Sequence, residues 1–520
     1  MNVWARVSEG WTALEVILVA LLTSIGYVVT TALYNIYFHP LSKFPGPKLA
    51  ASSWLWKAYV EVIKGESILD RLSKLHEEYG PVVRIAPDEL HFNDPAVYNE
   101  IYTARSRWNK DDVMYAPFGK DTSIFTTREF REAKKRRDLS APHFSRKTVL
   151  SLQGLIQEGI DEFCEVITKR DADSKTTDIF RAFRCLDFDN VSSFCFGWSE
   201  HAIQAPDFNS AAVEELQHSN KDFQFWKHFL RLPLPVLLLA SVYFRIKHKI
   251  WPLPYSTVYR RIKNQIATYI DKPEELDKTP HPTVFHVLMD SSHGTRLSAT
   301  AMAEEASLFL IAGTDTTSNA SALGTIFALS DNGYMRNKLK EELKSVWPRL
   351  EDKPSLEVLE SLPYLKAVCK ESLRLSHGAM SPLMRVVPQQ GAVLGGHFVP
   401  GGTKVGMAHT FVHFNPTLFP EPHTFRPERW LEPGAEALDT WNVAFSKGPR
   451  SCLGINLAWC ELYMNIAHIF RRFDLKLEQG VQKLFDKKPP VRPYDLWHRD
   501  CFLPYLDGVD LLVYATPSTD

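Results

Sequence analysis

One short stretch near the C-terminal end, residues 445–454, constrains this chain more than any other part of its sequence. It reads F-S-K-G-P-R-S-C-L-G, and Gly448 with Pro449 predicts a tight turn, because glycine tolerates backbone angles that other residues avoid. Residues 453–470 contain no proline and have helical periodicity. Cys452 is therefore expected where a loop leads into a helix N-terminus, and free N–H groups with the helix dipole favour a thiolate there.

A thiolate at this position is suited to hold iron, and a haem held by cysteine is the arrangement that favours cleavage of an O–O bond. The neighbouring residues suit the same purpose: Arg450 can meet a haem propionate, Phe445 can shield the sulfur, and Gly454 lets the helix approach a flat ring. With Gly448 and Cys452, these positions resemble the signature of the cytochrome P-450 family of haem-thiolate monooxygenases. The alternative is a buried structural cysteine at a helix start, since buried cysteine is common.

A second stretch, A-G-T-D-T-T at residues 312–317, lies within a proline-free run that predicts a long helix over residues 298–330. It matches the family's oxygen-handling motif. Glycine and threonine are poor helix formers, so the cluster indicates a functional distortion. Gly313 would leave room beside the ring for dioxygen, Thr316 would hydrogen-bond it, and Asp315 would relay protons from solvent as a general acid. Taken alone, these residues are also compatible with a weak turn that faces solvent.

Three charged residues extend the resemblance. Glu371 and Arg374 lie three apart, so on a helix they share a face and can pair, although most such pairs are surface ion pairs. Arg429 lies in the segment P-E-R-W at residues 427–430. In the family, the equivalents of these three residues form a buried charge network that holds the haem side of the core. Such a network specifies a structure more than it stabilises it.

Two further arginines are predicted to bind haem propionates. The helix predicted over residues 128–139 carries four consecutive basic residues, Lys134, Lys135, Arg136 and Arg137. Arg137 lies where the family places a propionate-binding arginine, although Ala133 stands where the family usually has Trp or His. The other three basic residues form a solvated face or help to dock an acidic reductase. Arg385 is the second candidate, and its alternative is a charge at a strand edge.

The N-terminal part predicts a membrane anchor. Residues 1–15 form a short tail, and residues 16–33 are uncharged and just long enough to span a bilayer, the alternative being a buried core helix. Residues 34–48 contain three prolines and predict a stiff hinge, which resembles the proline hinge of microsomal family members. A second apolar run, residues 232–244, is too short to span a membrane; it is either a core element or a segment that dips into lipid.

Composition and cysteine spacing limit the classes of partner and site that this chain can have. The net charge of −1 gives no footprint for nucleic acid. Seven scattered cysteines without a C-x-x-C pair argue against a zinc site and a disulfide framework, and they fit a reducing, cytosol-facing environment. His409 and His413 are four apart without further ligands nearby, so both are interpreted as structural.

The elements predict a mainly helical protein with a smaller β-rich part. Residues 68–79 have a helical pattern, and residues 82–85 and 89–92 predict a β-hairpin. The resemblance implies a cytochrome P-450-like fold for residues 49–520, with haem b bound through Cys452.

The resemblance also implies an activity. The protein would take electrons from an NADPH-cytochrome reductase, with a small haem electron-carrier protein as a further donor, and insert oxygen into an apolar small molecule. It would be a single-pass protein of the endoplasmic reticulum membrane whose catalytic domain faces the cytosol. Residues 39–51 and 80–92 look like filamentous-fungal secondary-metabolism members, which suggests a terpenoid or polyketide substrate. Three alternatives remain. A haem-thiolate isomerase or dehydratase needs no external electrons. A haem-binding sensor or carrier needs the Cys452 loop but not Asp315 and Thr316, and a membrane-anchored non-haem scaffold needs neither.

Overall fold

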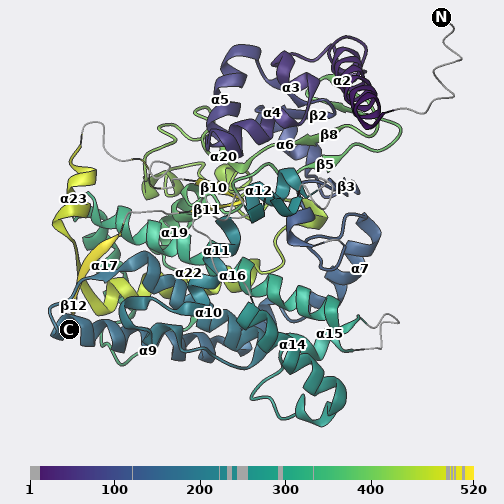
Figure 1. Cartoon of the computed structure of the whole chain (residues 1–520). Coiled ribbons are helices and arrows are strands. Elements are labelled where there is room, and N and C mark those ends of the chain that lie inside the picture. The colour runs from purple at the N-terminus through teal and green to yellow at the C-terminus, as the bar shows by residue number, and fades with distance from the viewer. Residues whose placement is uncertain are drawn as a thin grey trace, which may run out of the picture.

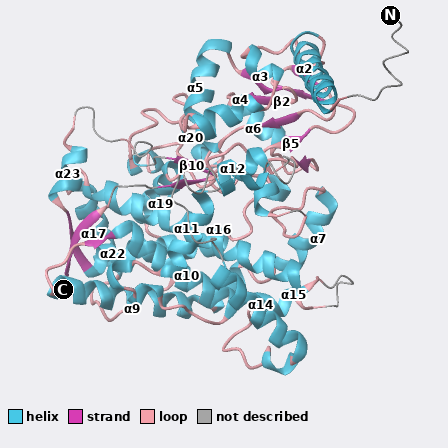
Figure 2. Cartoon of the chain, in the orientation of Figure 1, coloured by secondary structure: helices cyan, strands magenta, loops and turns pink. Residues whose placement is uncertain are grey.

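The computed structural model describes residues 12–119, 121–221, 223–230, 237–239, 241–242, 256–290, 297–331, 333–487, 492, 496, 499–505 and 510–519. Helices make up most of the molecule, and the strands gather in its upper part and at one lower edge (Figures 1 and 2). The predicted fold class, mainly helical with a smaller β-rich part, is confirmed.

The helical bulk is arranged around α16 (Ala299–Leu329), which runs through the middle of the molecule (Figure 1). This helix packs most extensively on α10 (Ile179–Phe196), α14 (Ser256–Asp271), α19 (Pro363–Leu375) and α22 (Ile455–Arg472), and it also contacts α17 (Tyr334–Val346). The longest surrounding helix, α9 (Gln153–Ala172), packs on α10 and α22. The largest hydrophobic core lies between these helices.

The predicted long helix over residues 298–330 corresponds to α16 within one residue at each end. The Ser298 side chain caps it by accepting a hydrogen bond from the Ala301 backbone N–H at 3.2 Å. Because the helix is apolar on nearly all sides, it is stable only when other elements surround it, as they do here.

The smaller part contains a five-stranded sheet whose strand order is β1-β2-β8-β5-β3. Its members are β1 (Val82–Ala86), β2 (Glu89–Phe92), β8 (Lys404–Gly406), β5 (Arg385–Val386) and β3 (Asn109–Lys110). The predicted hairpin is present: β1 and β2 pair antiparallel, with Val82 opposite Phe92. The helix predicted over residues 68–79 is α5 (Ile68–Tyr79). Pairing of β3 with β5 brings Lys110 opposite Arg385.

The remaining described strands form three smaller sheets. One has three strands in the order β4 (Thr177–Asp178), β12 (Leu512–Pro517) and β9 (Phe473–Leu477). The other two are pairs: β6 (Ala392–Leu394) with β7 (His397–Val399), and β10 (Arg499–Cys501) with β11 (Leu503–Tyr505). The other α-helices are α3 (Lys48–Ser52), α4 (Leu55–Ala58), α6 (Pro95–Ile101), α7 (Phe130–Ser140), α8 (Arg146–Ser151), α11 (Ala211–Lys221), α12 (Phe223–Phe229), α15 (Val284–Leu288), α18 (Leu356–Glu360), α20 (His409–His413), α21 (Glu436–Asp439) and α23 (Gln479–Phe485).

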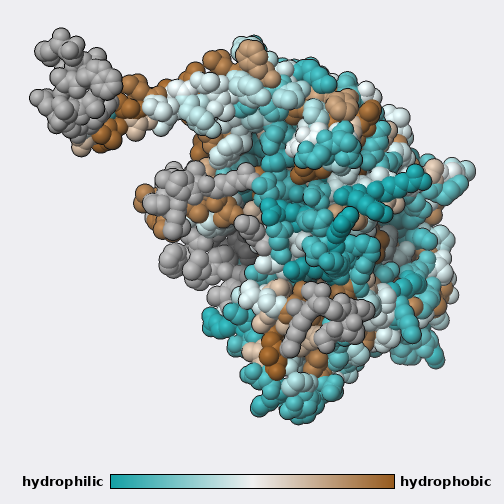
Figure 3. Space-filling view, turned by 90° about the vertical axis from the view of Figure 1, so that its right-hand side faces the viewer, coloured by the Kyte–Doolittle hydropathy of each residue, from teal (hydrophilic) through white to brown (hydrophobic). Residues whose placement is uncertain are grey.

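The predicted membrane segment lies inside a longer helix, α2 (Ala13–Tyr37), which has no buried residue. By length and composition α2 is a candidate to cross a membrane. In Figure 3 its brown, apolar surface projects from the upper part of the molecule. The proline-rich segment that follows is held against the domain: Leu41 and Phe44 are buried, and the Arg84 backbone N–H donates to the Pro45 carbonyl at 2.7 Å.

The second apolar run, residues 232–244, falls largely outside the described residues, which include only 237–239 and 241–242 of it. Within this described part, Leu238, Leu239 and Val242 are exposed. These three residues therefore do not belong to the core.

The helix predicted over residues 128–139 is α7 (Phe130–Ser140), which begins later because the Glu129 side chain caps it. Its basic residues differ in their surroundings. Lys134 and Lys135 form exposed ion pairs within the helix, with Asp138 and Glu132 respectively. Arg136 instead turns inward, toward α16, and donates to the Thr122 carbonyl at 2.8 Å. Of the three residues predicted to face solvent or a partner protein, Lys134 and Lys135 are thus exposed and Arg136 is not.

Candidate active site

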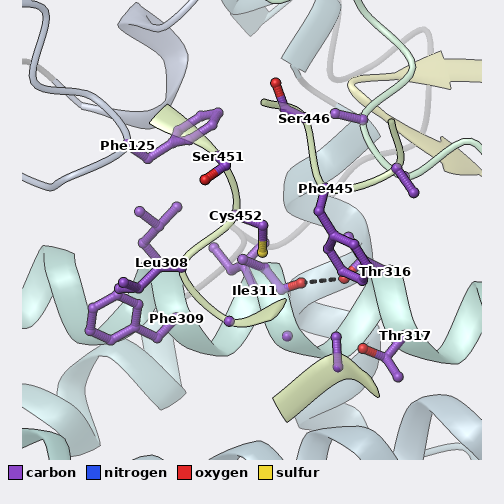
Figure 4. A pocket seen from close by; sticks show the side chains of 18 of the residues that line it. Phe125, Leu308, Phe309, Ile311, Thr316, Thr317, Phe445, Ser446, Ser451 and Cys452 are labelled. Atoms are coloured by element: carbon purple, nitrogen blue, oxygen red, sulfur yellow. Dashed lines mark hydrogen bonds between the residues drawn. The ribbon is translucent and has the colours of Figure 1, made fainter. Parts of the chain in front are cut away.

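An apolar cavity with a volume of about 290 Å³ lies between the middle of α16 and the loop that carries Cys452. Figure 4 shows the Cys452 sulfur directed toward the segment of α16 that carries Ile311 and Thr316. Among the six cysteines whose surroundings are described, Cys452 alone is accessible, and it is accessible to this cavity. The thiol singled out by the sequence is therefore the one that a bound group can reach.

The Cys452 loop has a fixed shape. A 3₁₀ turn over Gly448–Arg450 carries Gly448 at φ +72°, and a Cβ there would lie 2.5 Å from the Thr103 carbonyl oxygen, so only glycine fits. The Cys452 backbone N–H donates to the Phe445 carbonyl at 2.9 Å and closes the loop. Helix α22 begins three residues later, at Ile455, which is two residues after the predicted start.

The surroundings of the Cys452 sulfur do not favour a thiolate by themselves. Burial among the cavity walls raises the pKa of the Cys452 thiol, and the Gly454 backbone N–H and the Arg137 side chain only partly oppose this. The backbone N–H at the helix start thus lowers the pKa of the thiol in the expected direction, but burial outweighs it. A metal ion at the sulfur would supply the missing positive charge, because a coordinating thiol loses its proton.

Basic side chains gather on one side of the cavity. Arg137, Arg450 and Lys110 line it, and each donates to backbone carbonyls: Arg137 to Ser451 at 2.6 Å, Arg450 to Thr127 at 2.7 Å, and Lys110 to Phe125 at 2.6 Å. Within the described part of the chain, none of these three cations forms an ion pair. Burial lowers the pKa of Arg450 to about 10 and that of Lys110 well below its ordinary value, and the nearby cations add to both shifts.

Arg385 lies behind this wall rather than in it. Its guanidinium donates to the Tyr115 hydroxyl at 2.8 Å and to the carbonyls of Leu383 and Met384. Through the β3–β5 pairing it nevertheless lies close enough to lower the pKa values of Arg450 and Lys110. Direct binding of a propionate by Arg385 stays a prediction, and these hydrogen bonds of its guanidinium do not favour it.

Two features of the cavity fit a planar, dianionic group such as haem. The Arg450 Nε atom and both ring nitrogens of His409, which also lines the cavity, are buried without a hydrogen-bond partner among the described residues. Their polar atoms therefore suit anionic carboxylates such as propionates. A Cβ at Gly454 would meet no protein atom within 4 Å, so there is open space beside it for a flat ring. Phe445 lines the same space, with its ring centroid 5.9 Å from that of Trp459.

The motif on α16 divides between two faces of the helix. Thr316 lines the cavity, and its hydroxyl donates to the Ala312 carbonyl at 2.7 Å (dashed line, Figure 4). Gly313 also lines the cavity, but a Cβ there would lie 2.7 Å from a Val191 methyl carbon, so the glycine is needed for the close approach of α10.

Asp315 faces away from the cavity. It forms a buried ion pair with Arg184 of α10, with Nη2 and Nε at 2.7 Å and 2.8 Å from the same carboxylate oxygen. The structure therefore brings Asp315 neither to solvent nor to the cavity wall, contrary to the expectation of a relay from solvent. Removing either partner of this pair would leave a buried charge without its counter-ion.

The predicted charge network is assembled as the sequence indicated. Arg374 donates to Glu371 at 2.7 Å and 2.9 Å, and Arg429 donates to it at 3.1 Å. Trp430 of the P-E-R-W segment adds a hydrogen bond from its ring nitrogen at 2.9 Å. Burial opposes ionisation of Glu371, but the two arginines outweigh it and lower its pKa. The network joins α19 to the 3₁₀ segment Pro427–Trp430 on the Cys452 side of the core.

Sequence reasoning missed Lys110, His409 and Glu461 as residues of the cavity wall. Lys110 precedes two aspartates and therefore reads as a surface charge. His409 was interpreted as structural, and nothing in the local pattern distinguishes it from His413. Glu461 follows Cys452 by two and a half helical turns, and the helical spacing of α22 is the one signal that would have found it.

Comparison with known proteins agrees with this geometry. The cytochrome P-450 family model matches residues 47–493. The cytochrome P-450 monooxygenase flvC of Aspergillus flavus is 34% identical over 94% of this chain and 94% of its own. The monooxygenase macH of Penicillium terrestre is 36% identical over 87% of this chain and 90% of its own. The monooxygenase tpcC of Cochliobolus heterostrophus is 33% identical over 90% of each. The chain thus belongs to the cytochrome P-450 family of haem-dependent monooxygenases.

Proposed function

We propose that this protein oxidises an apolar small molecule, by hydroxylation or epoxidation, in the cavity between α16 and the Cys452 loop. The observation that carries the proposal is the accessible Cys452 thiol in an apolar cavity, rimmed by cations that form no ion pair with any described residue. When bound, haem b supplies an iron at which dioxygen is reduced. Cys452 would hold that iron, and Arg137, Arg450, Lys110 and His409 would hold the propionates.

The other residues of the site would shape the reaction space. Phe445 would cover the sulfur, and Gly448 and Gly454 would keep the loop close to the ring plane. The Thr316 hydroxyl would orient oxygen and direct protons toward it, because it is the hydroxyl on the cavity side of the distorted motif. Glu371, Arg374 and Arg429 would hold the loop side of the core in place. Asp315, bound to Arg184, would fix α10 against α16 behind the site.

The walls of the cavity indicate the class of substrate. Aromatic and aliphatic side chains dominate them, including Phe118, Phe125, Phe309, Ile311 and Phe502. Such a site recognises a substrate by shape and apolar surface and excludes water from the reacting carbon. A terpenoid or polyketide of fungal secondary metabolism fits this chemistry.

Exposed residues of α7 and α2 support a proposal for how the protein receives electrons and where it is located in the cell. Electrons would come from an NADPH-cytochrome reductase, or from a small haem electron-carrier protein, which would dock near the exposed Lys134 and Lys135. Residues 16–33 would anchor the protein in the endoplasmic reticulum membrane, residues 34–48 would act as the hinge, and residues 49–520 would form the catalytic domain in the cytosol. The exposed apolar surface of α2 supports this arrangement.

The test is a turnover assay with the full-length protein in membranes. Terpenoid and polyketide libraries are incubated with NADPH, reductase and dioxygen, and products are analysed by mass spectrometry. We expect a product that is heavier by one oxygen atom, dependent on NADPH and labelled by ¹⁸O₂. A product that forms equally without NADPH and carries no label would instead identify a haem-thiolate isomerase or dehydratase.

A further inference from the structure

A buried ionic clamp joins the N-terminal part of the domain to α12, and Glu61 is at its centre. Glu61 lies in η1 (Tyr59–Ile63), a single π-helical turn that continues α4, and its side chain is 1% exposed. Such turns are rare and often occur at functional sites. The Lys227 Nζ atom of α12 donates to Glu61 Oε1 at 2.7 Å, and the His228 Nε2 atom lies 2.5 Å from Glu61 Oε2.

The charge state of Glu61 follows from these contacts. Burial opposes ionisation, but Lys227 and His228 outweigh it and lower the pKa of Glu61 to about 2. Because an ionised carboxylate only accepts hydrogen bonds, His228 donates from Nε2. Glu61 therefore holds two consecutive residues of α12, one with each carboxylate oxygen, and we call these three residues the Glu61 clamp.

A hollow lies beneath the clamp. This cavity of about 270 Å³ has Lys227 and His228 of α12 in one wall, and Glu89 of β2 and Lys404 of β8 in the wall formed by the five-stranded sheet. Packing contacts with α12 are interrupted there, because a void supplies no partner atoms. The position of this end of α12 therefore depends on the clamp and on a small apolar cluster around Phe225.

The other end of α12 supports the wall of the active-site cavity. Its first residue, Phe223, lies behind two aromatic residues that line the cavity, with its ring centroid 5.1 Å from that of Phe118 and 5.5 Å from that of Phe502. The rings of Phe118 and Phe502 are 5.0 Å apart. The Lys227 ammonium lies 5.6 Å from the centre of the Phe223 ring, within the range of a cation–π contact. Contacts thus lead without a gap from Glu61 to the cavity wall.

Phe502 depends on the rings around it. Its φ is +75°, in the left-handed region that a bulky side chain rarely adopts. A residue keeps such a conformation only where the surrounding structure fixes it. The rings of Phe118, Phe125 and Phe223 surround Phe502, each with its centroid within 5.5 Å. A shift of α12 would withdraw Phe223 and let this part of the wall relax.

We propose that Glu61 is a positioning residue for substrate selection. By holding one end of α12, it keeps Phe223 behind Phe118 and Phe502 and so fixes the shape of the apolar wall. This inference rests on the proposed function, because the wall selects a substrate only if the cavity binds one beside the haem. Without the clamp the wall yields, so a ligand that packs on it binds less tightly, whereas a ligand too small to reach it is unaffected.

Azole binding to the purified, haem-loaded, full-length protein tests this without turnover. Imidazole is too small to reach the aromatic wall, whereas clotrimazole carries several aryl rings, and both shift the haem absorption band when they bind. We expect Glu61→Gln to weaken clotrimazole binding about tenfold, as for the loss of one or two aromatic contacts, and to leave imidazole binding unchanged. Glu61→Asp, which keeps the charge, should recover part of the affinity.

The control is a second buried ion pair at the same hollow. Glu89→Gln breaks the pair of Glu89 with Lys57, which includes no residue of α12. An equal loss of clotrimazole binding in Glu89→Gln and Glu61→Gln would show general loosening and would overturn the proposal. The double variant Glu61→Gln, Lys227→Met removes both charges, so it tests the clamp without leaving an unpaired buried charge, and it should show the same tenfold loss.

A double-mutant cycle tests the route through Phe223. Phe223→Leu alone should weaken clotrimazole binding to a similar extent. Adding Glu61→Gln to it should cause little further loss, because both changes remove the same support. Losses that multiply in the double variant would refute this route.

The failure of this inference differs from that of the proposed function. A wild-type protein without a haem absorption band would contradict the proposed function. A wild-type protein that binds haem and both azoles, with clotrimazole affinity unchanged in Glu61→Gln, would refute the positioning role alone.

Discussion

At the scale of single residues, the Thr316 hydroxyl can be removed with little change to the fold, since alanine is the better helix former. We expect Thr316→Ala to bind haem and consume NADPH at rates close to wild type. Product per NADPH should fall and peroxide should rise, because protons are no longer directed to oxygen. The measurement is NADPH, product and peroxide in the same reaction. Thr325→Ala is the control, since Thr325 makes the same backbone hydrogen bond on α16 but is buried away from the cavity. Full coupling in Thr316→Ala would show that this hydroxyl does not face the reacting oxygen.

The buried ion pair between Asp315 and Arg184 can also be tested by single substitutions. Asp315→Asn leaves the Arg184 guanidinium buried without its counter-charge, which costs about 3–5 kcal/mol of unfolding free energy. We expect this variant to lose stability in urea titrations, and the double variant Asp315→Asn, Arg184→Gln to regain part of it. A fully stable Asp315→Asn with slow turnover would instead support the proton relay that the sequence motif predicts.

At the scale of elements, the contact between α16 and the loop before α7 is sensitive to pH. Glu305 of α16 accepts hydrogen bonds from the Ile124 backbone N–H at 2.8 Å and 3.1 Å, and burial raises its pKa from 4.5 to about 7. The folded state therefore binds more protons than the unfolded state between these values, so the unfolding free energy falls as pH rises through this window.

Glu305→Gln should remove this part of the pH dependence, which is on the order of 3 kcal/mol between pH 4.5 and 7. Urea titrations at several pH values give the unfolding free energies of wild type and Glu305→Gln. In the difference between the two, the contributions of other titrating groups cancel. Parallel stability curves for the two proteins would mean that Glu305 is ionised throughout.

At the scale of the whole molecule, Asn35 joins the candidate membrane helix α2 to the domain. Within the described residues, the Arg84 guanidinium donates to the Asn35 carbonyl at 2.8 Å, and the Asn35 amide donates to the Ser52 carbonyl at 3.2 Å. Deleting residues 1–33 keeps Asn35, whereas deleting residues 1–38 removes it. We expect both truncations to retain haem and to bind membranes more weakly in flotation assays, with lower thermal stability only for the longer deletion.

Residual flotation of the truncated proteins would reveal a second membrane contact, and the exposed Leu238, Leu239 and Val242 are the described residues suited to it. Complete release into the soluble fraction would exclude that contact. Loss of haem from the shorter truncation would contradict a separate anchor.

The sequence predicts those parts of this molecule whose partners are near in the chain. Helix α16, the β1–β2 hairpin and the pairing of Glu371 with Arg374 depend on local spacing, caps and turns, and each was predicted. The motifs of the site were recognisable for the same reason. The orientation of Asp315 could not be predicted, because its partner Arg184 is 131 residues away and belongs to a different helix.

Residues of the cavity wall likewise depend on partners that are far away in the sequence. Lys110 reaches it through a strand pairing with Arg385, and Glu461 reaches it through the packing of α22 on α16. Such contacts depend on how elements pack in three dimensions, and a single sequence carries no periodicity that reports them.

The central claim is that Cys452 holds a haem iron, and a carbon-monoxide difference spectrum of the reduced, full-length protein tests it most directly. Wild type should show the band of a thiolate-ligated haem, and Cys452→Ala should lose it. Cys460→Ala, which removes a buried cysteine that does not line the cavity, should keep it. Cys452→His should at most bind haem without this band, because the electron donation of the thiolate is gone. A thiolate-type band that persists in Cys452→Ala would contradict the account.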